Sequence, residues 1–500
     1  MDFTSTRSNQ NVSSAFAISN GLAQDGGLFV PRTFPQLSPD FFTSLIPLSY
    51  KERAKKVLSL FLTDFTQEEL EYCVNGAYTG SFDNEQPAPL REVLKDVFSL
   101  ELWHGPTCAF KDLALQILPY LLTTAAKKTS PGRTKVILVA TSGDTGKAAL
   151  EGFADVPGTR IIVFYPQDGV SRMQKLQMTT QDGKNVAVCG IHGNFDDAQT
   201  GVKSILTDSE MKETLNSMNM DFSSANSINF GRLVPQVVYY ISAYCDLLKT
   251  HKVAPGQLFN IAVPTGNFGN ILAAIYAKFM GMPVHKFICA SNRNNILTDF
   301  IRTGVYDRNR PFYVTTSPSM DILISSNLER LLYHLYANDV QAVNALMSSL
   351  KENGKYEVSP AVRDSLQQLL YGGSCDDDQT KEMISRSYRE NGYLYDTHTA
   401  VAADVYRKYV SETGDTRPCI IASTASPYKF APAVLSAVYG ENVPADDFEK
   451  LNLLSQTTDT AIPLPLSSLQ NKQVRHSNCI EKSEMCAFIL DFLKKETKPE

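Results

Sequence analysis

The sequence lacks the patterns that mark membrane, nucleic-acid-binding and metal-binding proteins. It contains no run of roughly eighteen apolar residues, so no membrane-spanning helix is expected. It contains no long block of Lys or Arg and its net charge is −6, which argues against nucleic acid or an anionic membrane as the main partner. The 9 cysteines are scattered singly, without a Cys-x-x-Cys pair or a Cys/His cluster, so neither a metal site nor a disulfide framework is predicted.

The same absences bear on location. The N-terminus carries no basic patch followed by an apolar run, so we do not expect a secretory signal. An odd number of single cysteines fits reduced thiols, and we therefore expect a cytoplasmic protein. The 500 residues allow about two or three domains, and a composition of 43% hydrophobic and 20% charged residues is ordinary for a globular chain.

Apolar runs alternate with helical stretches through most of the chain. The first block has predicted strands at 136–140, 160–165 and 185–189. The second block has predicted strands at 258–263, 284–290 and 418–422. Strands that alternate with helices indicate an α/β fold with doubly wound parallel-sheet domains, and ligands bind such sheets beyond the carboxyl ends of the strands.

We divide the chain into segments on this pattern. Residues 1–95 form an N-terminal cap region, with helices expected at 39–46, 50–62 and 67–77. The other segments are a smaller α/β domain at 96–225, a larger α/β domain at 226–470, and a C-terminal helix and tail at 471–500.

A lysine stands where a predicted strand at 97–102 gives way to a predicted helix. The chain breaks at a Gly-Pro pair, and leucine and isoleucine then recur at helical spacing. Lys111 is the first charged side chain after this turn and directly follows Phe110. Aromatic neighbours can desolvate such a lysine, which disfavours the ammonium and frees a nucleophilic amine. The alternative is a solvated lysine in the first helical turn.

A loop that reads Ser-Gly-Asp-Thr-Gly, at 142–146, follows one strand and precedes a helix. Its amides and the helix dipole should face an anion. A nucleotide-hydrolase phosphate loop requires Gly-x-x-x-x-Gly-Lys-Ser/Thr, but Thr141 replaces the first Gly and Ala148 replaces the hydroxyl residue. We therefore exclude an ATPase or GTPase and predict an anion site of another kind.

A second loop follows the strand at 258–263. It reads Gly266, Asn267, Phe268, Gly269 and Asn270 and leads into a helix. We predict a bowl of backbone amides there, suited to a phosphate dianion. The spacing is not Gly-x-Gly-x-x-Gly, so a nicotinamide dehydrogenase is disfavoured.

Motifs in a fixed order carry a family resemblance. They are Phe-Lys at 110–111, Ser-Gly-Asp-Thr-Gly at 142–146, Gly-Asn-Phe-Gly-Asn at 266–270 and Ser-Thr-Ala-x-Pro at 423–427. Together they resemble the fold-type II enzymes of pyridoxal 5′-phosphate, the tryptophan synthase β-like group. Within that group the chain is similar to the threonine synthase family of bacteria and fungi, over nearly its whole length.

The resemblance implies roles for the motif residues. Lys111 would hold the cofactor as a Schiff base and, once the substrate amine displaces it, act as general base. The loop at 266–270 would hold the cofactor phosphate, Thr424 would meet the pyridine nitrogen, and Asp144 would contact the 3′-oxygen. The expected substrate contacts are Ser142, Gly143, Thr145, Arg232, Asn292 and Asn294, with Arg293 and Lys429 as further candidates for the substrate phosphate.

The family reaction converts O-phospho-L-homoserine and water into L-threonine and phosphate. The resemblance therefore implies a carbon–oxygen lyase that acts on a phosphate ester, with a small phosphorylated amino acid as its partner, as a monomer or a homodimer. The chain departs from the usual family pattern at Thr397, Ser426 and Tyr428, where the family has Pro, His and Ala. These departures bear on the substrate-facing side of the site.

Two alternatives from other functional classes stay open at this point. The same scaffold could serve a phospho-lyase that forms a keto acid from O-phosphothreonine or O-phosphohomoserine. It could also serve a non-catalytic protein that retains the fold, although Lys111 and both anion loops are intact.

Overall fold

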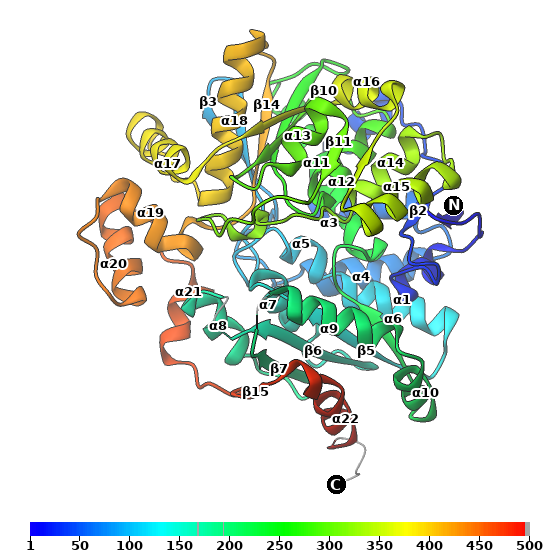
Figure 1. Cartoon of the computed structure of the whole chain (residues 1–500). Helices are drawn as coiled ribbons and strands as arrows, with labels where there is room; N and C mark the ends of the chain where they lie inside the picture. Colours follow the sequence, from blue (N-terminus) through cyan, green and yellow to red (C-terminus); the bar gives the residue numbers. More distant parts are fainter. Residues whose placement is uncertain (168–169, 194, 496–500) are drawn as a thin grey trace.

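The protein is built on two main sheets of parallel strands, as Figure 1 shows. The computed structural model describes residues 1–167, 170–193 and 195–495. In these residues the larger sheet runs in the order β13 (Leu370–Ser374), β10 (Val284–Ser291), β9 (Phe259–Pro264), β14 (Cys419–Ser423), β4 (Val97–Glu101) and β3 (Leu90–Leu94). The smaller sheet runs in the order β15 (Cys479–Ile480), β7 (Val186–Ile191), β6 (Thr159–Pro166), β5 (Thr134–Ala140) and β8 (Met220–Ser224).

All pairs in both sheets are parallel except β3 with β4. The central strands are buried along their whole length, β5 from Lys135 to Ala140 and β9 throughout. A parallel sheet covered by helices on both faces needs such continuous apolar strands. The predicted α/β class with two parallel sheets is confirmed.

Helices cover both sheets. In the smaller unit they are α7 (Asp144–Phe153), α8 (Arg172–Thr179), α9 (Phe195–Thr207), α10 (Ser209–Ser217) and α22 (Met485–Lys495). Around the larger sheet they are α11 (Phe230–Lys249), α12 (Gly269–Phe279), α13 (Ile296–Thr303), α14 (Leu328–Leu335), α15 (Val340–Asn353), α16 (Pro360–Leu369), α17 (Asp377–Asn391), α18 (Thr397–Thr413), α19 (Ala431–Val438), α20 (Asp447–Thr458) and α21 (Leu464–Ser467), with the short hairpin of β11 (Val305–Asp307) and β12 (Lys355–Glu357).

The N-terminal region packs against α11 and α6, and its helices follow their sequence signals. β1 (Phe3–Ser5) pairs with β2 (Phe29–Pro31), and the helices are α1 (Ser14–Asn20), α2 (Pro39–Ser44), α3 (Tyr50–Phe61) and α4 (Gln67–Tyr78). Both α3 and α4 begin with a complete capping box, Ser49 with Glu52 and Thr66 with Glu69. The three predicted cap helices are confirmed with small shifts at their ends.

The helix predicted after Lys111 is wrong in one respect, because it is divided. α5 covers Asp112–Leu115 and α6 covers Leu118–Thr129. Pro119 at the start of α6 has no amide hydrogen, and its ring excludes the carbonyl of the residue four positions earlier. That residue is Leu115, where α5 ends.

The sheets also divide the chain differently from the expected segments. β4, placed in the smaller domain by the sequence pattern, pairs with β14 in the larger sheet. β15 pairs with β7, and α22 packs its apolar side chains on the smaller sheet, so the C-terminal segment belongs to the smaller unit. A short apolar run does not reveal its partner strand, and here each partner lies far away in the chain.

Among the described residues, none of the helices combines the length and the apolar character that crossing a bilayer requires. None of the 9 cysteines, all of which lie in the described residues, forms a disulfide.

Candidate active site

A cavity of about 390 Å³ lies beyond the carboxyl ends of strands from both sheets. Ala140 at the end of β5 and Pro264 at the end of β9 both line it. It gathers most of the residues that the sequence singles out: Lys111, Ser142, Asp144, Thr145, Arg232, Gly266, Asn267, Phe268, Gly269, Asn270 and Thr424. The crevice at such strand ends is where ligands bind in open α/β folds.

Lys111 is desolvated, as its aromatic neighbour predicts. Its side chain is 9% exposed, and its Nζ lies 4.7 Å from the centre of the Phe110 ring and 3.7 Å from Asp144 Oδ2. Burial lowers the pKa of Lys111 to about 8, and the attraction of Asp144 limits the fall. The alternative of a solvated lysine is wrong.

The loop before Lys111 is held by Asp112. The Thr107 amide donates to Asp112 Oδ2 (2.8 Å) and the Thr107 hydroxyl to Oδ1 (2.7 Å). Gly105 is required there, since a Cβ at this position would lie 2.5 Å from Asp112. The Phe110 amide donates to the carbonyl of Thr424 (2.8 Å), which fixes Lys111 beside the end of β14. Burial raises the pKa of Asp112 to about 6.

The single tryptophan lies on the same loop. Trp103 Nε1 donates to Ser423 Oγ (3.1 Å), next to Thr424, and its ring stacks on His104 with the ring centres 4.3 Å apart. The loop is therefore joined to the end of β14 at a second point.

Asp144, the first residue of α7, receives contacts from both sides of the cavity. Lys429 Nζ lies 3.0 Å from Oδ1, and Gln174 Nε2 donates to the same oxygen (3.0 Å). Ser319 Oγ donates to Oδ2 (3.3 Å), the oxygen that also faces Lys111. Burial alone would raise the pKa of Asp144, but Lys429 and Lys111 hold it well below its ordinary value. Asp144 is an anion at every physiological pH.

The residues of the loop at 266–270 line the cavity. The carbonyls of this loop are engaged from behind, that of Gly266 by Ser325 Oγ (2.7 Å) and that of Asn267 by the amide (3.1 Å) and side chain (2.9 Å) of Asn327. Within the described chain the amides at 266–270 donate to no other group. Phe268 adopts the left-handed conformation (φ 63°) that ends the turn and starts α12.

Two further features fit this loop to an anion. A Cβ at Gly266 would lie 2.6 Å from the carbonyl oxygen of Ser319, so only glycine lets the backbone come this close. Asn270 Oδ1 accepts from the hydroxyls of Tyr239 (2.8 Å) and Tyr240, which leaves its Nδ2 buried without a partner in the described chain. An unpaired buried donor on a cavity wall calls for an acceptor from a ligand.

Arg232 has more N–H groups than the surrounding residues engage. It is buried on α11, and among the described residues its guanidinium donates one hydrogen bond, from NH1 to the carbonyl of Ala225 (3.0 Å). No carboxylate of the described residues forms an ion pair with it, and burial lowers its pKa to about 10. A guanidinium normally has a carboxylate or phosphate partner when it is buried, so a ligand anion would complete this one.

Three predicted contacts do not line the cavity. Gly143 (φ 135°) packs under the Gln174 side chain, where a Cβ would lie 2.5 Å away. Asn292 and Asn294 both donate to Asp321 Oδ1 (2.7 and 3.0 Å). Their amides are thus used to hold the segment 313–321, whose residues Pro318 to Asp321 line the cavity in their place.

Two further candidates, Arg293 and Lys429, do not line the cavity. Arg293 is exposed and lies over the Tyr313 ring, 3.9 Å from its centre. The Lys429 ammonium is engaged with Asp144.

Sequence reasoning missed other residues of the wall. His398 lines the cavity, with its Nδ1 3.0 Å from Asp396 Oδ1 and its Nε2 accepting from the Ser319 amide (3.2 Å). Asp396 is also the N-cap of α18, and this Asp-x-His pattern at a helix start was the available signal. Lys203 and Gln199 reach the cavity from α9, where a surface helix pattern gives no such sign.

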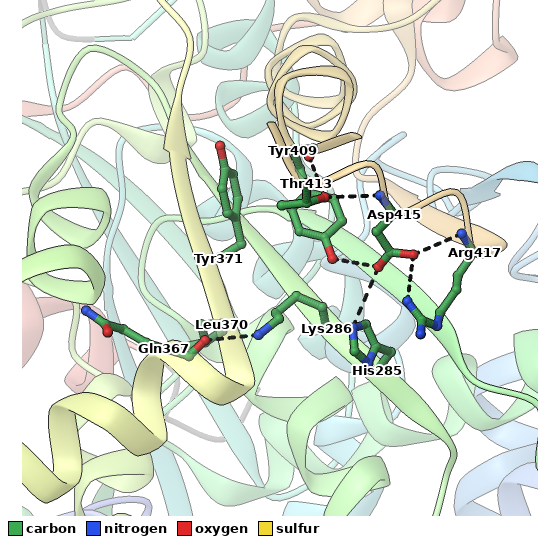
Figure 2. Close-up of a pocket in the computed structure, with 9 residues that line it drawn as sticks. All are labelled: His285, Lys286, Gln367, Leu370, Tyr371, Tyr409, Thr413, Asp415 and Arg417. Carbon is green, nitrogen blue, oxygen red and sulfur yellow. Dashed lines mark hydrogen bonds and ion pairs between the residues drawn. The ribbon is translucent and has the colours of Figure 1, made fainter. Parts of the chain in front are cut away.

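A second cavity, of about 380 Å³, lies at the opposite end of the larger sheet (Figure 2). Lys286 Nζ donates to the carbonyl of Gln367 (3.0 Å), and Asp415 accepts from Arg417 (2.9 Å) and the Tyr409 hydroxyl (2.6 Å). His285 Nε2 lies 3.7 Å from the same carboxylate. The charged groups of this cavity therefore have partners within the protein, Lys286 on a backbone carbonyl and Arg417 on Asp415.

Known proteins match the whole chain. Residues 2–78 match "Threonine synthase N terminus", residues 84–423 match "Pyridoxal-phosphate dependent enzyme", and residues 399–479 match "Threonine synthase, C-terminal". Threonine synthase-like 1 of Homo sapiens is 41% identical over 97% of this chain, which spans 66% of the length of that relative. The threonine synthase of Pseudomonas aeruginosa is 37% identical, over 92% of this chain and 94% of its own. The crystal structure of pyridoxal-phosphate-bound threonine synthase from Brucella melitensis superposes with a TM-score of 0.88 at 34% identity and covers 100% of both chains.

Proposed function

The chain belongs to the threonine synthase family of pyridoxal-phosphate-dependent enzymes, and from this premise we propose that it is itself a threonine synthase. It would convert O-phospho-L-homoserine and water into L-threonine and phosphate, the last step of threonine biosynthesis. We place this activity in the cytoplasm, since none of the cysteines in the described part of the chain forms a disulfide. The proposal includes a monomer or homodimer that needs no partner beyond its small substrate.

The cavity fits the cofactor that the family uses. The free amides at 266–270 and the unpartnered Nδ2 of Asn270 suit the cofactor phosphate, and Lys111 suits its covalent attachment. Thr424 suits the pyridine nitrogen, because a hydroxyl meets it without adding charge. Bound pyridoxal phosphate supplies an electron sink for negative charge that develops on the neighbouring carbons.

Lys111 is the proton carrier in this proposal. An amine whose pKa is about 8 accepts and returns protons readily near neutral pH. Its position at 3.7 Å from Asp144 holds the released amine at the cavity wall, within reach of adjacent carbon atoms of one substrate. The same group thus serves successive proton transfers.

The anion sites supply the recognition. Arg232 and the Ser142–Thr145 turn lie on the cavity apart from the loop at 266–270, and they would bind the carboxylate and the phosphate of the substrate. The single observation that carries the proposal is this combination of a poised lysine with several unpaired anion-binding groups in one cavity. A substrate with two anionic ends matches it.

Product analysis tests the proposal. Purified protein is given O-phospho-L-homoserine, and threonine, 2-ketobutyrate, ammonia and phosphate are measured together. We expect one threonine for each phosphate released, without ammonia. Release of phosphate with equal 2-ketobutyrate and ammonia would replace the synthase by the phospho-lyase.

The phospho-lyase is the second candidate because the sequence identities do not single out the threonine synthases among the relatives. The threonine synthase-like 1 relative is 41% identical, whereas the Pseudomonas threonine synthase is 37% identical. The cavity groups described above serve phosphate elimination in either enzyme. Parallel assays with O-phospho-L-threonine distinguish the two, since only the lyase gives 2-ketobutyrate from it.

A further inference from the structure

Lys429 occupies an unusual place for a lysine. Its side chain is 0% exposed, on the short turn Pro427–Phe430 after β14. Its Nζ has two partners, the carbonyl of Thr107 (2.8 Å) and Asp144 Oδ1 (3.0 Å). Burial of an ammonium destabilises the fold unless the charge is paired, so the partners of Lys429 indicate its role.

These two partners are both connected to Lys111. Thr107 binds Asp112, the residue after Lys111, through its amide and hydroxyl. Asp144 carries Lys429 on Oδ1 and faces Lys111 with Oδ2, at 3.7 Å. Lys429 and Lys111 therefore share one carboxylate without sharing one oxygen.

We propose that Lys429 is a positioning residue that acts through Asp144, and that it neutralises this carboxylate so that Lys111 gives up its proton more readily. Without Lys429, the whole charge of Asp144 would face Lys111, and the two would form a buried ion pair that keeps Lys111 an ammonium. The inference rests on the proposed function, because it gives the same site a residue that readies its base.

The electrostatics of the surroundings agree with this role. The charged groups that act on Lys111 come from separate elements and are Asp144 on α7, Arg232 on α11, Lys429 on the turn after β14, and Asp112 on α5. Burial is the main cause that lowers the pKa of Lys111, Asp144 raises it, and Arg232 and Lys429 lower it further. Removal of Lys429 therefore raises this pKa, and removal of the Asp144 charge lowers it.

Trace labelling of the cofactor-free full-length chain tests the inference. A small amount of acetic anhydride acetylates neutral amines, and mass spectrometry of the Lys111 peptide between pH 6 and 11 gives its titration. We expect Lys429→Met to raise the titration midpoint of Lys111 by about one unit or more, with roughly fivefold less labelling at pH 8. Lys429→Arg keeps the charge and should stay within about half a unit of the wild type.

Asp144→Asn supplies a second comparison of Lys111 midpoints, with and without Lys429→Met, and this comparison does not depend on whether the single variant Lys429→Met folds. The expected order of Lys111 midpoints, from low to high, is Asp144→Asn, the double variant Asp144→Asn with Lys429→Met, the wild type, and Lys429→Met. A merely structural Lys429 would leave the Lys111 midpoint unchanged in both pairs of proteins, and that result overturns the inference. A reversed order overturns it as well.

The labelling uses neither substrate nor cofactor, so it separates this inference from the proposed function. If the four proteins show the expected order of Lys111 midpoints but the wild type makes no threonine, only the proposed function is contradicted. An active wild type in which Lys429→Met leaves the Lys111 midpoint in place would contradict only the role of Lys429.

Discussion

The two cavities of the larger sheet are nearly equal in volume and opposite in chemistry. The one at the carboxyl ends of the strands measures about 390 Å³ and the one at the amino ends about 380 Å³. In the first, Asn270 Nδ2 has no acceptor among the described residues, Arg232 donates only to the carbonyl of Ala225 there, and burial lowers the pKa of Lys111. In the second, Asp415 satisfies Arg417 and Tyr409, and backbone carbonyls satisfy Lys286. Unmet hydrogen-bonding capacity, and not volume, distinguishes a ligand site from a gap in the surface.

The largest expected effect follows from the lysines of the two cavities. Lys111→Ala should abolish turnover, by about four orders of magnitude or more, because covalent attachment and proton transfer are lost together. The measurement is the rate of phosphate release from O-phospho-L-homoserine. Lys286→Ala is the matched control in the second cavity and should keep activity within about twofold. Near wild-type turnover in Lys111→Ala would falsify the assignment.

The next largest effect is expected on the KM for substrate, from the arginines of the two cavities. Arg232→Met should raise KM for the phosphorylated substrate by about 30- to 100-fold. This factor corresponds to the loss of about 2–3 kcal/mol, the contribution of a charge-assisted hydrogen bond. The comparison is Arg417→Met, whose guanidinium already has Asp415, and which should leave KM unchanged. Steady-state kinetics of both variants decide the matter. Equal KM values for the two variants would remove Arg232 from the substrate site.

A smaller effect, on the affinity for the cofactor, is expected from the asparagines near the two cavities. Asn270→Ala removes the unpartnered Nδ2 and should weaken binding of pyridoxal phosphate about tenfold, measured by titration of the absorbance of the bound cofactor. Asn260 donates to Asp415 (3.0 Å) in the second cavity, so Asn260→Ala should reduce stability and leave cofactor affinity as it is. An unchanged affinity in Asn270→Ala would show that this amide faces no ligand.

The smallest effect on activity is expected at Asp415. Burial would raise its pKa, but hydrogen bonds from Tyr409, Asn260 and Arg417 hold it well below its ordinary value near 3.8. A carboxyl with a depressed pKa stabilises the folded state above its unfolded pKa and loses that contribution as pH falls below it. Asp415→Ala should therefore lower the free energy of unfolding by about 1–3 kcal/mol at pH 7, and by less below about pH 4. Urea unfolding at both pH values checks this, with turnover at pH 7 unchanged.

The sequence alone predicts the part of this molecule that depends on local signals. Buried strands such as β5 and β9 read as continuous apolar runs, and helices such as α3 begin at a capping box. The loops around Gly266 and Asp144 could be placed at strand ends, and Lys111 between a strand and a helix, because each motif lies between recognisable elements.

The remaining features depend on contacts between distant residues. The pairing of β4 with β14 joins segments more than 300 positions apart, and nothing in either strand names its partner. Asn292 and Asn294 have the residue type of ligand contacts, but Asp321 takes their amides. Lys429 could be found from the sequence only as a cation near a strand end, since its role depends on its distance from Asp144.

Trp103 gives the protein an internal optical reporter. It is the only tryptophan in the 500 residues, and its indole is fixed to Ser423 beside Thr424, on the loop that leads to Lys111. Its ultraviolet emission overlaps the absorption of a pyridoxyl chromophore, so energy transfer should quench it whenever the site is loaded. Fluorescence of the unlabelled protein can thus follow the arrival and departure of the cofactor in real time.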